Sequence, residues 1–136
     1  MQIARTLLAP LVALVAAALP AAAQDAPTPQ EVADACIARV VEITDATVDR
    51  VQAAAAAGVQ RIRALDDDGA PNPVIIRAGR AGVQAIERRA GAGIERVNTL
   101  VRRCIVVLRR MDADQALIAQ ARAAREAGTS RIRGAA

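Results

Sequence analysis

Two long stretches of this chain share one spacing of apolar residues, and this spacing restricts the fold more than any other feature. Mostly small or aliphatic residues recur at alternating steps of three and four. In the first stretch they are Ile37, Val41, Thr44, Val48, Val51, Ala55, Gly58, Ile62 and Leu65, and in the second they are Ile76, Gly79, Val83, Ile86, Ala90, Gly93, Val97, Leu100, Cys104, Val107 and Met111. This is the heptad pattern of coiled-coil packing, so each stretch is predicted to be a helix with one contact seam.

The segment LDDDGAPNP, residues 65–73, separates the two stretches and is predicted to be a turn. Folding the chain at residues 70–71 pairs the seams so that partner numbers sum to 141. Five successive central layers then set a larger residue against Ala or Gly, as Ile62 against Gly79. We therefore predict an all-α fold built on an antiparallel two-helix coiled-coil hairpin. Gly82 and Gly91 lie off the seam, and the pairing gives no reason for them.

Cap residues place the helix boundaries. Thr28 and Glu31 form a capping box before the first helix, and Asn72 before Pro73 is predicted to cap the second. Beyond the second helix, the chain either continues it or begins a third short helix from a capping box at Asp112. The expected order is a short linker 24–28, helix 29–65, turn 66–72, helix 73–111, overhang or third helix 112–127, and flexible tail 128–136.

The segment 1–23 has the composition of a signal peptide. One arginine precedes an apolar run from Leu7 to Leu19, and Ala21-Ala22-Ala23 suits a signal peptidase. An uncleaved membrane anchor is the alternative, but the run is short for a span and Pro10 interrupts it. The chain is rich in Ala and Arg, which is typical of a GC-rich bacterial genome. We expect an exported bacterial protein, periplasmic or secreted.

The two cysteines are placed symmetrically about the expected turn. Cys36 precedes position 70 by the same sequence distance at which Cys104 follows it, so the hairpin brings the two cysteines to one level. In an oxidising compartment they are predicted to form an intrachain disulfide. An intermolecular bridge and free thiols remain alternatives. Closing this loop stabilises the fold by roughly 4 kcal/mol in the chain-entropy model.

The composition argues against catalysis. The chain contains no His, Lys, Tyr, Phe or Trp, and its single serine, Ser130, lies near the C-terminus. Both cysteines are assigned to a disulfide, and the remaining carboxylates are scattered on the expected helix exteriors, with no cleft to raise a pKa. The chain also lacks the ligands of a zinc site. We expect no enzyme activity, no cofactor and no small-molecule substrate. The hydrophobic core must be built from Val, Ile, Leu and Ala alone.

Arginines form a stripe along the second helix, because four of them recur every seven residues. The stripe consists of Arg88, Arg89, Arg96, Arg102, Arg103, Arg109 and Arg110. In the antiparallel pairing the stripe faces Ala54, Thr47 and Val40, not acids. One interpretation is a solvated flank whose aliphatic stems cover the seam. The other is a contact for an anionic surface, namely lipid headgroups, an envelope polymer or an acidic partner. Nucleic acid is not expected, because no aromatic side chain is present to stack on bases.

The cysteine end carries apolar residues beyond the seam. They are Val32, Val40, Ile43, Ile94, Val101, Ile105 and Leu108. Either the overhang folds back over them, or a second copy buries them in a four-helix bundle. Self-association is favoured. The predicted function is therefore an exported, non-catalytic structural or protein-interaction module, with a peripheral binder of anionic membrane or envelope surfaces as the alternative.

The acidic residues of the turn are not spaced like the ligands of a calcium-binding loop. An EF-hand loop needs acids at alternating positions and Glu at position twelve, whereas Asp66, Asp67 and Asp68 are consecutive and Arg77 takes the twelfth position. We expect calcium titration to leave the melting temperature unchanged, as measured by circular dichroism. A rise of the melting temperature with calcium would contradict the interpretation of this segment as a plain turn.

Overall fold

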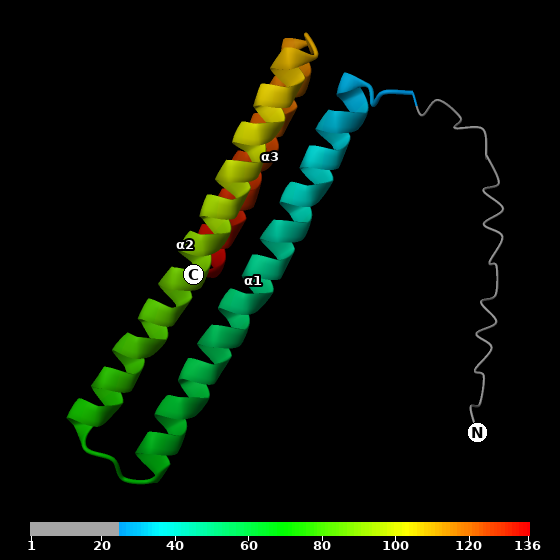
Figure 1. The fold of residues 1–136 in the computed structure, drawn as a ribbon. Coiled ribbons are helices and arrows are strands. Elements are labelled where there is room, and N and C mark those ends of the chain that lie inside the picture. The colour runs from blue at the N-terminus through cyan, green and yellow to red at the C-terminus, as the bar shows by residue number, and fades with distance from the viewer. Residues whose placement is uncertain (1–24) are drawn as a thin grey trace, which may run out of the picture.

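The computed structural model describes residues 25–136, which form three α-helices packed together. Helix α1 spans Pro29–Asp67, α2 spans Asn72–Arg110 and α3 spans Gln115–Ala135. Figure 1 shows α1 and α2 side by side in opposite directions, and α3 folded back along the half far from their connecting turn. The predicted all-helical class is confirmed. The expected cleavage after Ala23 lies outside the described residues.

Helix α1 begins at the predicted capping box. The Glu31 backbone N–H donates to the Thr28 hydroxyl at 3.2 Å, and the Thr28 backbone N–H donates to the Glu31 carboxylate at 2.7 Å. The backbone hydrogen bond and then the side-chain hydrogen bond from Thr28 lower the pKa of the Glu31 carboxyl below its ordinary value. Two backbone donors that a helix start leaves unpaired are thus satisfied.

The turn after α1 ends the helix through its backbone. Gly69 has a φ of 69°, a conformation that glycine adopts without penalty. Its N–H donates to the Asp66 carbonyl at 2.9 Å, and the N–H of Ala70 donates to the Leu65 carbonyl at 2.8 Å. This pair of hydrogen bonds is a Schellman motif, so the predicted turn is confirmed, although α1 runs two residues further than expected. Within residues 25–136, no group of three or more His, Cys, Asp or Glu is placed to hold a metal.

The predicted cap of α2 is wrong. Pro71 is the cap residue, with an extended backbone of φ −60° and ψ 142°, and no side chain caps the helix. Asn72 is already the first helical residue. The Pro71 carbonyl accepts from the N–H of Val74 at 2.8 Å. The ring of Pro71 holds its φ near the helical value, while its ψ stays extended. The helix therefore begins one residue earlier than the sequence predicted.

A second backbone motif turns the chain from α2 into α3. Asp112 has a φ of 52°, and the N–H of Ala113 donates to the Leu108 carbonyl at 3.0 Å. Asp114 caps α3, because its carboxylate accepts from the N–H of Ala116 at 3.0 Å. The third-helix alternative for the overhang therefore holds. The capping box at Asp112 is wrong, because that residue takes the left-handed conformation of a helix-ending position.

The predicted flexible tail is also wrong, because α3 continues to Ala135. Ile132 is fully buried, and Gly128 is buried against Thr44 and Val40 of α1. Gly128 therefore does not end the helix. It removes a side chain where α3 crosses α1, and the burial that follows stabilises the last two turns.

The hydrophobic core lies in the half of the molecule that α3 covers. It contains two clusters, one around Val51, Val97 and Ile132 and one around Leu108 and Ile118. Helix α3 thus contributes to both clusters. No residue from 52 to 89 is buried. The core is therefore a three-helix core, and the outer halves of α1 and α2 extend beyond it.

The seam prediction fails at four aliphatic positions. Val41, Ile76, Val83 and Val107 are 48%, 55%, 55% and 42% exposed. Near the disulfide, α3 lies to one side of the α1–α2 pair. The buried faces of α1 and α2 therefore point toward α3 and deviate from the predicted contact seam. In the outer half only two helices meet, and a two-helix contact leaves the edges of each seam in water.

Glycines mark the closest approaches of α1 and α2. Gly79 lies against Ile62, the partner that the pairing assigns to it. A Cβ on Gly82 would lie 3.8 Å from the Gly58 Cα, so the two helices are close at this layer, but an ordinary van der Waals contact of this kind does not require glycine at position 82. Gly93 lies against Thr47 instead of Val48, one residue away from the predicted layer.

The same substitution, glycine to alanine, at two positions of α2 tests this packing. A Cβ on Gly93 would lie 2.8 Å from the Thr47 Cβ, whereas a Cβ on Gly91 would meet nothing within 4 Å. We expect Gly93→Ala to lower the free energy of unfolding by about 1–3 kcal/mol through overpacking. Gly91→Ala should raise it by up to about 1 kcal/mol through helix propensity. Urea denaturation measures both, and equal effects of the two variants would contradict the close approach at Gly93.

Candidate functional site

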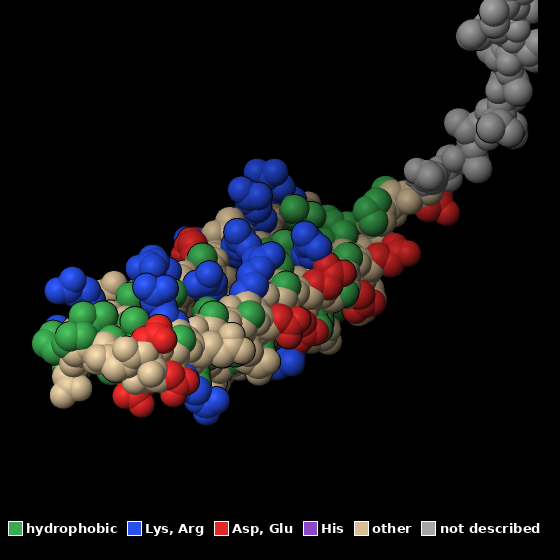
Figure 2. Space-filling model, turned by 90° about the horizontal axis from the view of Figure 1, so that it is seen from below, with side chains coloured by type: hydrophobic (Ala, Val, Ile, Leu, Met, Phe, Trp, Pro, Cys, Tyr) green, Lys and Arg blue, Asp and Glu red, His purple; other side chains and the backbone are tan. Residues whose placement is uncertain are grey.

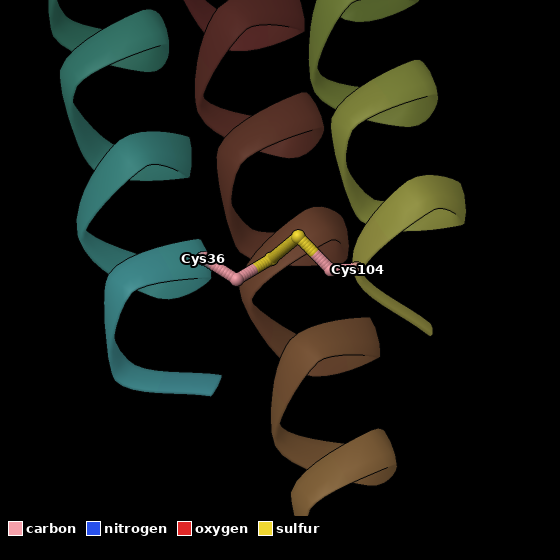
Figure 3. The surroundings of a disulfide bond; sticks show 2 residues. All are labelled: Cys36 and Cys104. Carbon is pink, nitrogen blue, oxygen red and sulfur yellow. A yellow bond between two sulfur atoms is a disulfide. The ribbon is translucent and has the colours of Figure 1, made fainter. Parts of the chain in front are cut away.

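A disulfide joins α1 to α2 beside the candidate site. The Cα atoms of Cys36 and Cys104 are 6.3 Å apart, and Figure 3 shows the bridge between the two helices with α3 behind it. Cys36 is 4% exposed. The pair indicates an oxidising compartment. It also holds α1 and α2 together at the level where a groove opens between them.

The groove runs between α1 and α2 and is lined by residues of these two helices only. Its larger part has a volume of about 670 Å³ and continues into a second hollow of about 400 Å³. Its lining residues Ala46 and Arg50 lie on the side of α1 turned away from Thr44, which contacts Gly128 of α3. The groove therefore opens on the face of the helix pair opposite α3.

Arginines from both helices form the walls, over an aliphatic floor. We call this feature the arginine groove. Its six arginines are Arg39 and Arg50 from α1 and Arg88, Arg89, Arg96 and Arg103 from α2. Its floor consists of Ile43, Gly93 and Leu100, and the exposed residues Ala46 and Ala92 also line the groove. Since the aliphatic parts of the arginine side chains can lie along this floor, their guanidinium groups are held at the rim of the groove.

Few of these charges are neutralised. Within the described part of the chain, the only ion pair of a groove arginine joins Arg39 to Glu42 at 2.5 Å. The other acid of the lining, Glu95, pairs with Arg102 outside the groove at 2.9 Å. Five of the six groove arginines therefore have no carboxylate partner. The imbalance is general along α2, which carries nine arginines and two glutamates, a net charge of +7.

Figure 2 shows the same asymmetry on the surface. Arginine side chains gather mostly along one edge of the molecule, and acidic side chains gather along the other. The heptad repeat of the arginines produces this separation, because residues seven apart lie on one side of a helix. Within the described residues, the arginine groove therefore carries an excess of positive charge over its acidic residues.

The predicted arginine stripe divides into three parts. Arg88, Arg89, Arg96 and Arg103 line the groove. Arg102 faces Glu95, and the last two, Arg109 and Arg110, lie in the last turn of α2, where cations stabilise the helix dipole.

Sequence reasoning missed Arg39 and Arg50, the α1 side of the groove. The antiparallel register carried part of the signal, since a sum of 141 sets Arg39 opposite Arg102, and sets Arg50 opposite Gly91, between Arg89 and Arg96. A search for charges on both partners of each layer would have found Arg39.

The residues predicted as an oligomer face lie mainly against α3. Val40, Val101 and Leu108 are at most 2% exposed, so their predicted availability to a second copy is wrong. The remaining four, Val32, Ile43, Ile94 and Ile105, are half-buried and pack against the core. The fold-back alternative accounts for the burial of this face, because α3 supplies the third side of the core.

No known protein family model, curated protein or solved structure matches this chain. Among the described residues, no helix is both long and apolar enough to cross a membrane. The function is consequently inferred from the geometry and charge of the arginine groove.

The unpaired arginines should repel one another measurably. We expect Arg96→Gln, at the centre of the groove, to raise the free energy of unfolding by a few tenths of a kcal/mol at low ionic strength. The gain should vanish near 1 M salt, where the screening length is about 3 Å. Arg61→Gln, outside the groove, is the control. A loss of stability in Arg96→Gln at low salt would contradict the absence of a carboxylate partner.

Proposed function

We propose that this protein is an exported, non-catalytic interaction module that binds an extended anionic polymer in the arginine groove. One observation carries the proposal: five arginines without carboxylate partners line both sides of one groove. Phosphate and carboxylate groups match the guanidinium fork, which donates two parallel hydrogen bonds to such an anion.

The shape of the site favours a linear ligand over a flat one. Arg50 stands on one wall, and Arg89 and Arg96 stand on the other. A flat bilayer would contact the rim of such a groove, whereas an extended chain can lie inside it with anions on both sides. The α2 wall runs from Arg89 to Arg103, which is about 21 Å of helix at about 1.5 Å per residue. A polymer with regularly spaced phosphates or carboxylates fits this length.

The scaffold suits a module of this kind. We infer that α1 and α2 act as an antiparallel coiled-coil hairpin, supported by the glycine contacts at Gly58, Gly79 and Gly93. The disulfide fixes the register of the two walls, so the arginines are arranged before a ligand arrives. The signal-like segment 1–23 and the disulfide together support export to the cell envelope.

A binding assay with linear polyphosphate tests the proposal. We expect the triple variant R50Q/R89Q/R96Q to bind polyphosphate about tenfold more weakly at low salt, if each contact contributes about 0.5 kcal/mol. Isothermal titration calorimetry measures the affinity. The matched control is R61Q/R122Q/R133Q, which loses the same charge from residues that do not line the groove.

The outcomes separate the alternatives. Equal weakening by the two triple variants would mean that net charge, not the groove, binds the polymer. Binding to vesicles of anionic phospholipid but not to polyphosphate would replace the proposal with the peripheral membrane binder. Loss of polyphosphate binding in the groove variant alone supports the proposal.

A further inference from the structure

The outer halves of α1 and α2 form an arm without a core. The arm comprises residues 52–67 and 72–89, and none of them is buried. Val59, Ile76 and Val83 are 48%, 55% and 55% exposed. Figure 2 shows hydrophobic side chains at the surface of the end where α1 and α2 are joined. A two-helix arm of this kind leaves aliphatic surface in water over its whole length.

The exposed aliphatic residues continue the face that α3 covers elsewhere. Val83 lies about five full helical turns before Val101, and Ile76 lies about five turns before Ile94. Val101 is fully buried in the same cluster as Ala121 and Ile132 of α3, and Ile94 packs against that cluster. The two arm residues therefore project on the α3 side of α2, opposite the arginine groove.

Helix α3 stops where the arm begins. Its last residues reach the cluster of Val51 and Ala90, and Figure 1 shows its end roughly midway along α1 and α2. All three helices of the described chain are then in use. A helix that carries an aliphatic face of the same width would bury this surface as α3 does elsewhere. The arm of a second copy contains such a helix.

Charges beside Val83 are arranged for such a copy. Arg80 lies three residues before Val83 and Glu87 lies four residues after it, so the three share one face of α2. Both charged residues are exposed, and neither belongs to an ion pair in the described part of the chain. When two α2 helices cross antiparallel with Val83 at the centre, Arg80 of each copy meets Glu87 of the other. Two Arg80–Glu87 pairs, related by the two-fold axis of the dimer, thus lie one on each side of the aliphatic contact at Val83.

We propose that two copies of this protein associate antiparallel through the α3 side of their arms and form a four-helix bundle. With Val83 at the centre, residues 77–89 of the two α2 helices face each other, which is about 20 Å of helix and enough for several layers of side chains. The two arginine grooves then face outward on opposite sides of the dimer. The inference goes beyond the polymer-binding proposal and does not depend on it, because the two use opposite faces of the helix pair.

A charge swap between two variants tests the dimer. Sedimentation equilibrium of the disulfide-bonded protein should show a dimer. R80E alone and E87R alone each replace two attractions with two repulsions, and we expect the dissociation constant to rise about tenfold for each. An equal mixture of R80E and E87R should recover the affinity of the natural protein, because each mixed dimer again has two opposite-charge pairs.

A matched pair of aliphatic substitutions tests the centre. Val83→Glu should raise the dissociation constant at least about a hundredfold, because it places two carboxylates together in an apolar contact. Val106→Glu makes the same change at a residue that is 46% exposed and lies outside the arm, so dimerisation should not change. Circular dichroism checks that helix content is retained. If V83E loses helix content, the charge swap alone decides the question.

Two results would overturn the inference. The first is a natural protein that stays monomeric at every concentration. The second is an R80E and E87R mixture that associates no more tightly than either variant alone. Weakening in each variant together with recovery in the mixture supports the antiparallel arrangement, because a parallel one would already set like charges together in the natural protein.

Discussion

The packing of α3 into one side of the α1–α2 pair is the interaction on which the rest of the structure depends. The chain has no aromatic residue, so its buried surface comes from aliphatic side chains alone. Two helices with such side chains meet along a narrow contact. The third helix widens it, and the largest fully buried side chains, Leu108, Ile118 and Ile132, all lie in the half that α3 covers or in α3 itself.

This packing divides the molecule into two unlike halves. The half with the disulfide has three helices and a closed core, and the arm has two helices and no buried residue. It also makes the two faces of the helix pair different. Since α3 occupies one face, the groove arginines of α2 lie on the other, where Arg39 and Arg50 of α1 complete the groove. A polyanion on one face and a second copy on the other would not compete.

Local signals in the sequence predicted much of the fold. The capping box at Thr28, the left-handed turn at Gly69 and the levelling of Cys36 with Cys104 all depend on residues close in sequence or on a count from the turn. Half of the candidate site was also predictable, because the arginine stripe of α2 follows one helical repeat. The α1 wall was not recognised, since no repeat in α1 marks Arg39 or Arg50.

The sequence by itself determined where α1 begins and where the chain turns after it, because a capping box and a positive-φ glycine act through local backbone geometry. Only the tertiary structure decided which faces are buried. Gly128 and Thr129 resemble the end of a helix, yet burial against Thr44 and Val40 keeps them helical. Likewise Val83 follows the seam pattern and remains exposed, because burial depends on a neighbour from a distant part of the chain and α3 does not reach that far.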